Sequence, residues 1–240
     1  MAWRPSDAGR LTECPLTHVA VLDPRTHGAL RLSPSLQVSS PGQLCMVAVV
    51  AKELDRVAVE APICFIKDGQ TGQFGMFALL GLRPGENRMV GPDGAWLGRY
   101  VPLDVRRGPF GLAMRDGQAA LTIDLANPRV AAAEGEALFD AGGQPSAGVR
   151  SAQAALSEMM AGVAVTRDLI RAICDHRLMA PAKIALGKGD EAPTLEGWYA
   201  IDTKALAALP GPALEALSRQ GYLFAIHLLA ISMINLERLI

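Results

Sequence analysis

The chain has 240 residues, of which 50% are hydrophobic and 5% aromatic, and its formal net charge is −1. A chain this apolar and this evenly charged is not a disordered tail, and its length allows one large domain or two smaller ones. The near-neutral charge argues against a nucleic-acid partner, because binding along phosphates needs a basic face.

Residues 1–125 are predicted to form a β-rich region. Short apolar runs between Gly, Pro and Asp residues are typical of strands. In this region they lie at residues 18–22, 44–50, 63–66 and 74–80. Apolar positions at helical spacing before Pro62 predict one short helix between residues 51 and 60. Asp116-Gly117 indicates a hairpin between two further apolar runs, because both positions of such a turn need positive φ.

The second half of the chain is predicted to be mostly helical. Residues 126–148, rich in Gly and Pro, form a connecting segment at the surface with Leu138-Phe139 as its apolar anchor. From residue 149 to residue 240 the apolar positions recur with a helical period, interrupted by one hairpin over residues 183–201. The expected fold class is α+β, with a β-rich half followed by a helical half, as separate regions or as one continuous domain.

Within the helical region we expect one helix over residues 152–161 and a second one that begins at Thr166. The Thr166 hydroxyl can accept from the free amides of a first helical turn. The apolar stripe of this second helix would consist of Leu169, Ile170, Ile173, Cys174 and Leu178.

Residues 222–234 form the most membrane-like segment. It is shorter than the roughly 20 residues that cross a bilayer, and it contains His227 and Ser232. We therefore expect a helix buried in a protein core and no integral membrane segment. The alternative, a peripheral membrane helix, would want a basic polar face, which this segment lacks.

The cysteines and the N-terminus favour a cytoplasmic protein. Arginines and a proline occupy the first ten residues, where a secretory signal would need an apolar run. The cysteines are widely spaced, sit among apolar neighbours and form no Cys-x-x-Cys pair; they are Cys14, Cys45, Cys64 and Cys174. Buried free thiols in a reducing compartment are the expected outcome.

No motif for a metal, a cofactor or a catalytic nucleophile stands out. His18, His27, His176 and His227 are isolated from one another, and no Gly-x-Ser-x-Gly elbow occurs. We expect no metal and no cofactor. Glu86, Asp175 and His176 are the remaining acid–base candidates, although a histidine near the end of a helix more commonly interacts with the helix dipole.

The densest constellation of chemically useful side chains lies between residues 80 and 110. We predict a ligand-binding site made of Arg83, Glu86, Asn87, Trp96, Arg99, Tyr100, Arg106 and Arg107. Planar guanidinium groups beside aromatic faces suit the recognition of carboxylates, peptides or glycans. The alternative is structural: the rings of Trp96 and Tyr100 pack under a long loop, while the arginines pair locally with carboxylates, namely Glu86, Asp93 and Asp104.

The same segments resemble the bacterial SapC-like family, which is named for a surface-layer-associated protein. The matching pieces are Ala61-Pro-Ile-Cys-Phe65, Leu80-Gly-Leu82 with Gly85-Glu-Asn87, Gly94-Ala-Trp96 with Tyr100-Val-Pro102, Arg106-Arg107 with Pro109-Phe110, Gly135-Glu-Ala-Leu-Phe139, Leu195-Glu-Gly197 with Ile201-Asp202, and Gly221-Tyr-Leu223 leading to His227-Leu-Leu-Ala-Ile-Ser232. Together they cover residues 27–240. Where such proteins usually have an aromatic residue before Pro-Phe, this chain has Gly108.

The resemblance implies a family without an established reaction, distinct from the like-named permease of peptide transporters. Its genes often lie near those of TonB-dependent receptors and of flavin-dependent halogenase-like or oxygenase-like proteins, which implies nutrient uptake or peptide modification. We therefore expect a non-enzymatic cytoplasmic binding or accessory module that recognises a peptide, glycan or protein partner. The alternatives are an enzyme that modifies a peptide or small molecule, and a structural protein associated with a surface layer.

Overall fold

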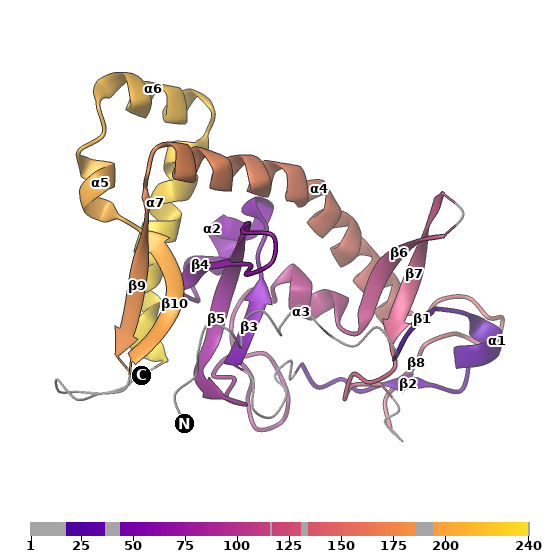
Figure 1. Cartoon of the computed structure of the whole chain (residues 1–240). Coiled ribbons are helices and arrows are strands. Elements are labelled where there is room, and N and C mark those ends of the chain that lie inside the picture. The colour runs from indigo at the N-terminus through magenta and orange to yellow at the C-terminus, as the bar shows by residue number, and fades with distance from the viewer. Residues whose placement is uncertain (1–17, 37–43, 116, 131–133, 186–193, 240) are drawn as a thin grey trace. The chain divides into compact units, whose positions relative to one another are not determined.

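The structure is a computed structural model that describes residues 18–36, 44–115, 117–130, 134–185 and 194–239 (Figure 1). It contains antiparallel sheets and helices, with most of the helices in the C-terminal part of the chain. The predicted α+β fold class is confirmed.

Contacts divide the chain into two compact units, each assembled from separate stretches. We call residues 1–14, 39–88 and 162–240 the five-stranded unit, and residues 15–38 and 89–161 the three-stranded unit, after their largest sheets. The boundaries predicted at residues 125 and 148 mark a change of element type along the chain and stay a prediction.

The five-stranded unit is built on an antiparallel sheet in the order β3-β5-β4-β10-β9. Its strands are β3 (Leu44–Ala48), β4 (Ile63–Lys67), β5 (Phe74–Pro84), β9 (Met179–Ala185) and β10 (Thr194–Ile201). Cys64, Leu79 and Trp198 are buried together in its core. Three strands predicted in the first half are confirmed here, and β9 and β10 confirm the predicted hairpin in the second half.

Short helices follow β3 and β10 in this unit. The predicted helix between residues 51 and 60 is confirmed as η4 (Ala51–Glu53) followed by α2 (Leu54–Val57). The C-terminal helices are α5 (Thr203–Ala207), α6 (Gly211–Arg219), α7 (Tyr222–Ser232) and η5 (Met233–Arg238). Two buried polar side chains hold the end of α7 and η5 against the rest of the unit. Ser232 Oγ accepts from the Ile63 amide at 3.0 Å, and Asn235 Nδ2 donates to the Ala58 carbonyl at 2.9 Å.

The helix expected at residues 222–234 is present as α7 and the start of η5, but its burial in the core is only partial. Ile226 and Leu229 are buried, but Phe224, Ile231 and Ile234 are 67%, 61% and 73% exposed. The segment is apolar on most sides, and in the described structure part of this apolar surface stays exposed although α7 contacts α2, α6, β4 and β10. In the described part of the chain no helix alone has the length and hydropathy to cross a membrane. Helix α6 together with residues 222–238 meets that test as a pair bent by 98°.

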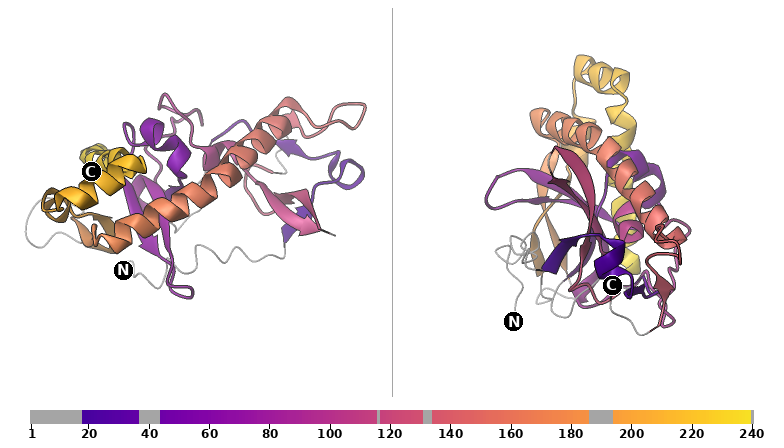
Figure 2. Two further views of the ribbon diagram at one scale, coloured as in Figure 1. Left: turned by 90° about the horizontal axis from the view of Figure 1, so that it is seen from above. Right: turned by 90° about the vertical axis from the view of Figure 1, so that its right-hand side faces the viewer.

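Helix α4 (Ala147–Asp175) is continuous, so the predicted break before Thr166 is wrong (Figure 2). Thr166 Oγ1 donates to the Gly162 carbonyl at 2.8 Å, four residues earlier, which is a bond that a threonine can make inside a helix. The same oxygen accepts from the Ala51 amide at 2.8 Å. The hydroxyl does satisfy a free amide, as expected of a cap, but the amide belongs to η4.

The second part of α4 corrects one expectation about the cysteines. Cys45 and Cys64 form no disulfide among the described residues and are buried as predicted, whereas Cys174 forms no disulfide but is exposed. Ile173 lies fully buried one residue earlier, and the next position on a helix is turned by about 100°, which takes Cys174 out of the core. Cys14 lies outside the described residues.

The three-stranded unit contains a sheet in the order β1-β7-β6 and a short ribbon of β2 and β8. Its elements are β1 (Val19–Val21), α1 (Pro24–His27), β2 (Arg31–Leu32), α3 (Leu103–Arg107), β6 (Phe110–Arg115), β7 (Gln118–Asp124) and β8 (Glu136–Ala137). The β6–β7 hairpin confirms the predicted turn, with Gly117 at φ 78°. Its core joins Phe110, Ile123 and Leu138 to Val149 and Ala152 of the first turns of α4.

Candidate functional site

The eight residues predicted to bind a ligand divide between the two units. Arg83, Glu86 and Asn87 belong to the five-stranded unit. The other five, Trp96, Arg99, Tyr100, Arg106 and Arg107, belong to the three-stranded unit.

In the five-stranded unit, Glu86 pairs with a neighbour in the sequence. Its Oε1 lies 2.7 Å from Nε of Arg88, a residue that the sequence analysis did not single out. Arg83 is exposed at the end of β5. This part of the predicted site therefore contains a local ion pair, as the structural alternative expected for Glu86, although the partner differs.

In the three-stranded unit, Trp96 belongs to a loop that folds back on itself. Trp96 forms an isolated bridge with Val90, and the Leu36 amide donates to the Gly94 carbonyl at 2.9 Å. Gly94 has φ 79°, and a Cβ there would lie 2.7 Å from Ser35 Oγ, so this close approach requires glycine. The Trp96 ring is partly buried by this fold, as the structural alternative predicted.

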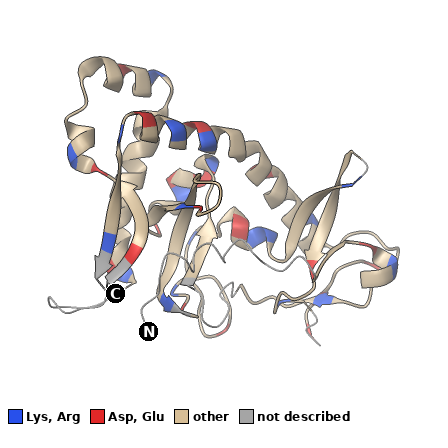
Figure 3. Ribbon diagram, in the orientation of Figure 1, with Lys and Arg blue, Asp and Glu red and all other residues tan. Residues whose placement is uncertain are grey.

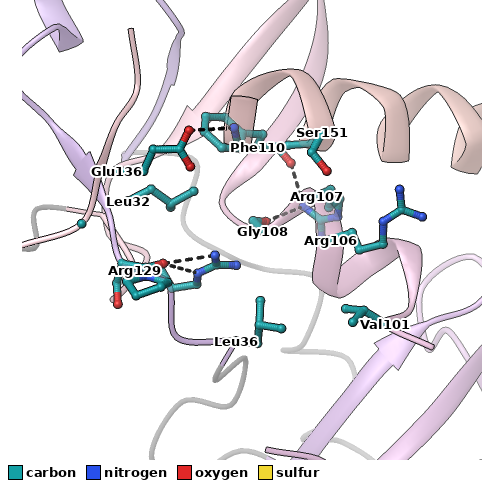
Figure 4. A pocket seen from close by; sticks show the side chains of 15 residues that line it. Leu32, Leu36, Val101, Arg106, Arg107, Gly108, Phe110, Arg129, Glu136 and Ser151 are labelled. Atoms are coloured by element: carbon teal, nitrogen blue, oxygen red, sulfur yellow. Dashed lines mark hydrogen bonds between the residues drawn. The ribbon is translucent and has the colours of Figure 1, made fainter. Parts of the chain in front are cut away.

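Arg106 and Arg107 do come together, in a pocket of about 460 Å³ within the three-stranded unit (Figure 4). Leu32, Leu36, Val101 and Phe110 supply apolar parts of its wall. Arg129, Glu136 and Ser151 supply further polar parts. The pocket thus combines an apolar lining with three guanidinium groups, two of which were predicted.

Helix α3 positions the two predicted arginines. Leu103 and Val105 are buried, which directs the next residues of the helix toward the pocket. Arg107 has its partners within the chain: Nε lies 2.6 Å from Asp104 Oδ1, and Nη1 donates to the Phe110 carbonyl at 3.0 Å. Arg107 is therefore primarily a structural residue, which holds the end of α3 against the start of β6.

Arg106 differs from Arg107, because its guanidinium makes no ion pair or hydrogen bond with the residues that the structure describes. It lines the pocket and is half-buried. Replacing its side chain would break no hydrogen bond or ion pair within the described residues, so Arg106 is a suitable position for testing the pocket.

Arg129, which the sequence analysis missed, reaches the pocket from the loop after β7. Nε and Nη2 both donate to the Ser33 carbonyl, at 3.3 and 3.2 Å. Burial lowers the pKa of Arg129, although a guanidinium stays charged. The Arg129 guanidinium is thus partly buried and hydrogen-bonded to a backbone carbonyl, and it forms no ion pair with a described carboxylate.

Gly108 makes room for Arg129. Gly108 has φ 56°, and a Cβ there would lie 3.0 Å from Nη1 of Arg129. Figure 4 shows the guanidinium extending toward Gly108 from the opposite wall. The glycine that stands where the resemblance leads us to expect an aromatic ring was the one sequence signal that something else fills this space.

Glu136 supplies a carboxylate to the pocket wall, and this carboxylate already has a hydrogen-bond partner within the protein. Its Oε1 accepts from the Gly148 amide at 2.9 Å, in the first turn of α4, where a negative charge is favoured. Since Asp104 pairs with Arg107, the pocket keeps Arg106 and Arg129 as two cations against this one engaged carboxylate.

The family model named SapC matches residues 22–239. The chain belongs to the SapC family. No curated protein and no solved structure matches it. The predicted resemblance is therefore confirmed over nearly the whole chain, and every residue of the pocket wall in this SapC protein lies inside the matched range.

The acid–base candidates of this SapC protein are not joined to one another by hydrogen bonds within the described ranges. Asp175 ends α4 and is exposed, and His176 follows it with its amide bonded to the Ala172 carbonyl at 3.1 Å. Desolvation and the neighbouring Asp175 carboxylate raise the pKa of the Cys174 thiol, which disfavours the thiolate. Among the described residues no group of three His, Cys, Asp or Glu side chains could hold a metal ion.

Proposed function

We propose that this SapC protein is a non-enzymatic binding or accessory module whose pocket holds an anionic group of a peptide, glycan or protein partner. The observation that carries the proposal is the pair Arg106 and Arg129, two half-buried guanidinium groups that line one pocket and have no described carboxylate partner.

The electrostatics of the pocket favour an anion. A guanidinium that has lost part of its hydration gains most from an anionic acceptor, since a hydrogen bond between two opposite charges is stronger than one between a guanidinium and a neutral carbonyl. Its planar fork matches a carboxylate or a phosphate. A volume of about 460 Å³ is that of a small-ligand site, and the apolar wall would contact the part of the ligand next to the charge.

The wider setting of this function is part of the same proposal. We place this module in the cytoplasm and link it to nutrient uptake or peptide modification; the N-terminal sequence supports the first and the family resemblance supports the second. The pocket supports binding more directly than it supports catalysis, because its cations are arginines, which hold a charge but do not exchange protons near neutral pH.

The test is calorimetric titration of the whole chain with inorganic phosphate and, separately, with succinate. We expect Arg106→Gln to weaken the affinity about tenfold, the loss of one charge-assisted contact. The matched control is Arg25→Gln, which removes the same charge from exposed α1 of the same unit. If neither anion binds, or if Arg106→Gln binds as tightly as Arg25→Gln, the proposal is wrong.

A further inference from the structure

Strand β6 is the outermost strand of its sheet, and its outer edge is unpaired in the part of the chain that the structure describes. The order is β1-β7-β6, and β7 pairs with the inner edge of β6 from Phe110 to Arg115 without a register shift. An edge of this kind presents backbone amides and carbonyls that another strand can use.

The hydrogen bonds around the hairpin show which backbone groups face outward. The Asp124 amide donates to the Pro109 carbonyl at 2.9 Å, so residue 109 and, by alternation, residues 111, 113 and 115 face β7. The Leu121 carbonyl accepts from Leu22 at 2.8 Å, away from β6, and Leu121 is opposite Leu112. Leu112 and Met114 therefore direct their N–H and C=O groups to the free edge.

This edge lacks the features that usually protect one. It contains no proline and no bulge, and Arg115 at the tip is the charged residue of the strand (Figure 3). Leu112 is 43% exposed and Met114 is 73% exposed, on the same face of the hairpin. A regular, apolar, unprotected edge is suited to an added strand.

The edge leads directly to the pocket. Arg107 Nη1 occupies the outward carbonyl of Phe110, at 3.0 Å, and both residues belong to the pocket wall. A strand added antiparallel to β6 runs from Met114 toward Phe110, so its C-terminal end reaches the arginines. A parallel strand would bring an N-terminal ammonium group there instead, and the guanidinium groups would repel it.

We propose that β6 accepts an extended peptide as an additional antiparallel strand, and that the C-terminal carboxylate of this peptide enters the pocket beside Arg106 and Arg129. The inference rests on the proposed function, because it requires the pocket to bind an anion. Main-chain hydrogen bonds to Leu112 and Met114 supply affinity that does not depend on the peptide's sequence. The requirement for a carboxylate makes the site specific for the C-terminal end of a chain. Alternate side chains of the peptide lie on the face of Leu112 and Met114, which favours apolar residues at every second position from the end.

The probe is a hexapeptide of alternating threonine and valine, labelled at its N-terminus and ending in valine with a free carboxylate, measured by fluorescence anisotropy. We expect the C-terminal amide of the same peptide to bind at least tenfold more weakly. Met114→Pro removes the outward amide without breaking the ladder to β7, and it should cause a similar loss. The matched control Met114→Ala keeps the amide and should lose less than threefold.

Phosphate titration of Met114→Pro separates the two proposals, because the pocket of this variant should bind phosphate like the wild type. If the wild type binds phosphate but not the peptide, the strand proposal is overturned and the anion pocket stands. The same holds if the wild type binds the C-terminal amide of the peptide as tightly as the free acid, or if Met114→Pro binds the free acid as tightly as the wild type does. A wild-type dimer that Met114→Pro dissociates also overturns it, since a second copy then occupies the edge. If neither phosphate nor peptide binds, both proposals fail.

Discussion

Ser232 Oγ and the Ile63 amide are 3.0 Å apart, and this hydrogen bond joins α7 to the start of β4 across 169 positions of sequence. Both residues are buried, and the same hydroxyl donates to the Leu229 carbonyl at 2.7 Å. A single oxygen thus satisfies a strand amide while keeping its own proton bonded.

Replacing Ser232 by alanine should destabilise the protein by about 1–3 kcal/mol, because the Ile63 amide would stay buried without an acceptor. Urea unfolding measures the change. Ser218→Ala, on exposed α6, is the control and should change the free energy of unfolding by less than about 0.5 kcal/mol. Equal effects of the two substitutions would contradict the assigned role of Ser232.

Gly108→Ala should weaken phosphate binding as well as stability. With φ 56° and ψ −132°, the Gly108 backbone has a conformation that costs a side chain about 1–3 kcal/mol, and the new Cβ would lie 3.0 Å from Arg129 Nη1, which must move. Gly117→Ala is the matched control, since Gly117 also has a positive φ but nothing within 4 Å of the added Cβ. We expect both variants to lose stability in urea unfolding and only Gly108→Ala to lose affinity for phosphate. If Gly108→Ala binds phosphate with unchanged affinity, Arg129 does not contribute to anion binding in the pocket.

The thiols should react with iodoacetamide in a fixed order in the folded protein. Burial raises the pKa of Cys64 far above that of an ordinary thiol, and its sulfur is enclosed, so alkylation requires unfolding. Cys174 is exposed and should be alkylated first, although more slowly than in unfolded protein, because its pKa is raised too. Mass mapping of the cysteine peptides with time checks this order. In urea the two should react alike, and alkylation of native Cys64 as fast as Cys174 would contradict the burial.

Asp68 should make the turn between β4 and β5 sensitive to acid. Hydrogen bonds from the Thr71 amide, the Thr71 hydroxyl and the Gln70 amide hold the pKa of Asp68 below its ordinary value of 3.8. A carboxylate with a lowered folded-state pKa contributes stability above its unfolded pKa and loses that contribution as pH falls through the folded value.

The variant Asp68→Asn keeps an oxygen acceptor and has no charge to titrate. We expect the wild type to be the more stable of the two in urea at about pH 7, and the difference to shrink as the pH falls below the ordinary pKa of an aspartate, toward about pH 2. Carbon NMR of the Asp68 carboxyl gives the pKa directly. A difference in stability that is the same at both pH values would rule out the carboxylate as its source.

The sequence was most informative where local pattern and tertiary structure agree. The apolar runs that became β3, β4 and β5 are bounded by turn residues, and their side chains meet on one core, so period and burial give the same answer. The hairpin turn at Gly117 could likewise be predicted, because the positive φ that it requires depends only on the residue type at that position.

The same kind of local signal was misleading where a residue far away in the sequence determines the role of a side chain. Thr166 has the chemistry of a cap, but its acceptor role is used by Ala51, which lies 115 positions away. Gly162 beside it packs against Val50, where a Cβ would come within 2.8 Å, so this glycine is a site of close packing and not a helix end.

The candidate site shows the same division. The arginine-rich segment correctly drew attention to Arg106, and the alternative of local ion pairs holds for Arg107, whose partner Asp104 lies three residues earlier. Arg129 could not be found from its neighbours, because its place in the pocket depends on the Ser33 carbonyl, 96 positions earlier.

The interleaved order of the two units has a consequence for biosynthesis. Strand β4 pairs with β5 on one side and with β10 on the other, while residues 89–161 of the three-stranded unit are translated between them. A chain that has left the ribosome only as far as residue 161 therefore carries β4 with one open edge and without Trp198 to complete its core. Strand β10 closes that edge when it emerges, so the five-stranded unit becomes complete only after residues 89–161 of the three-stranded unit have been synthesised.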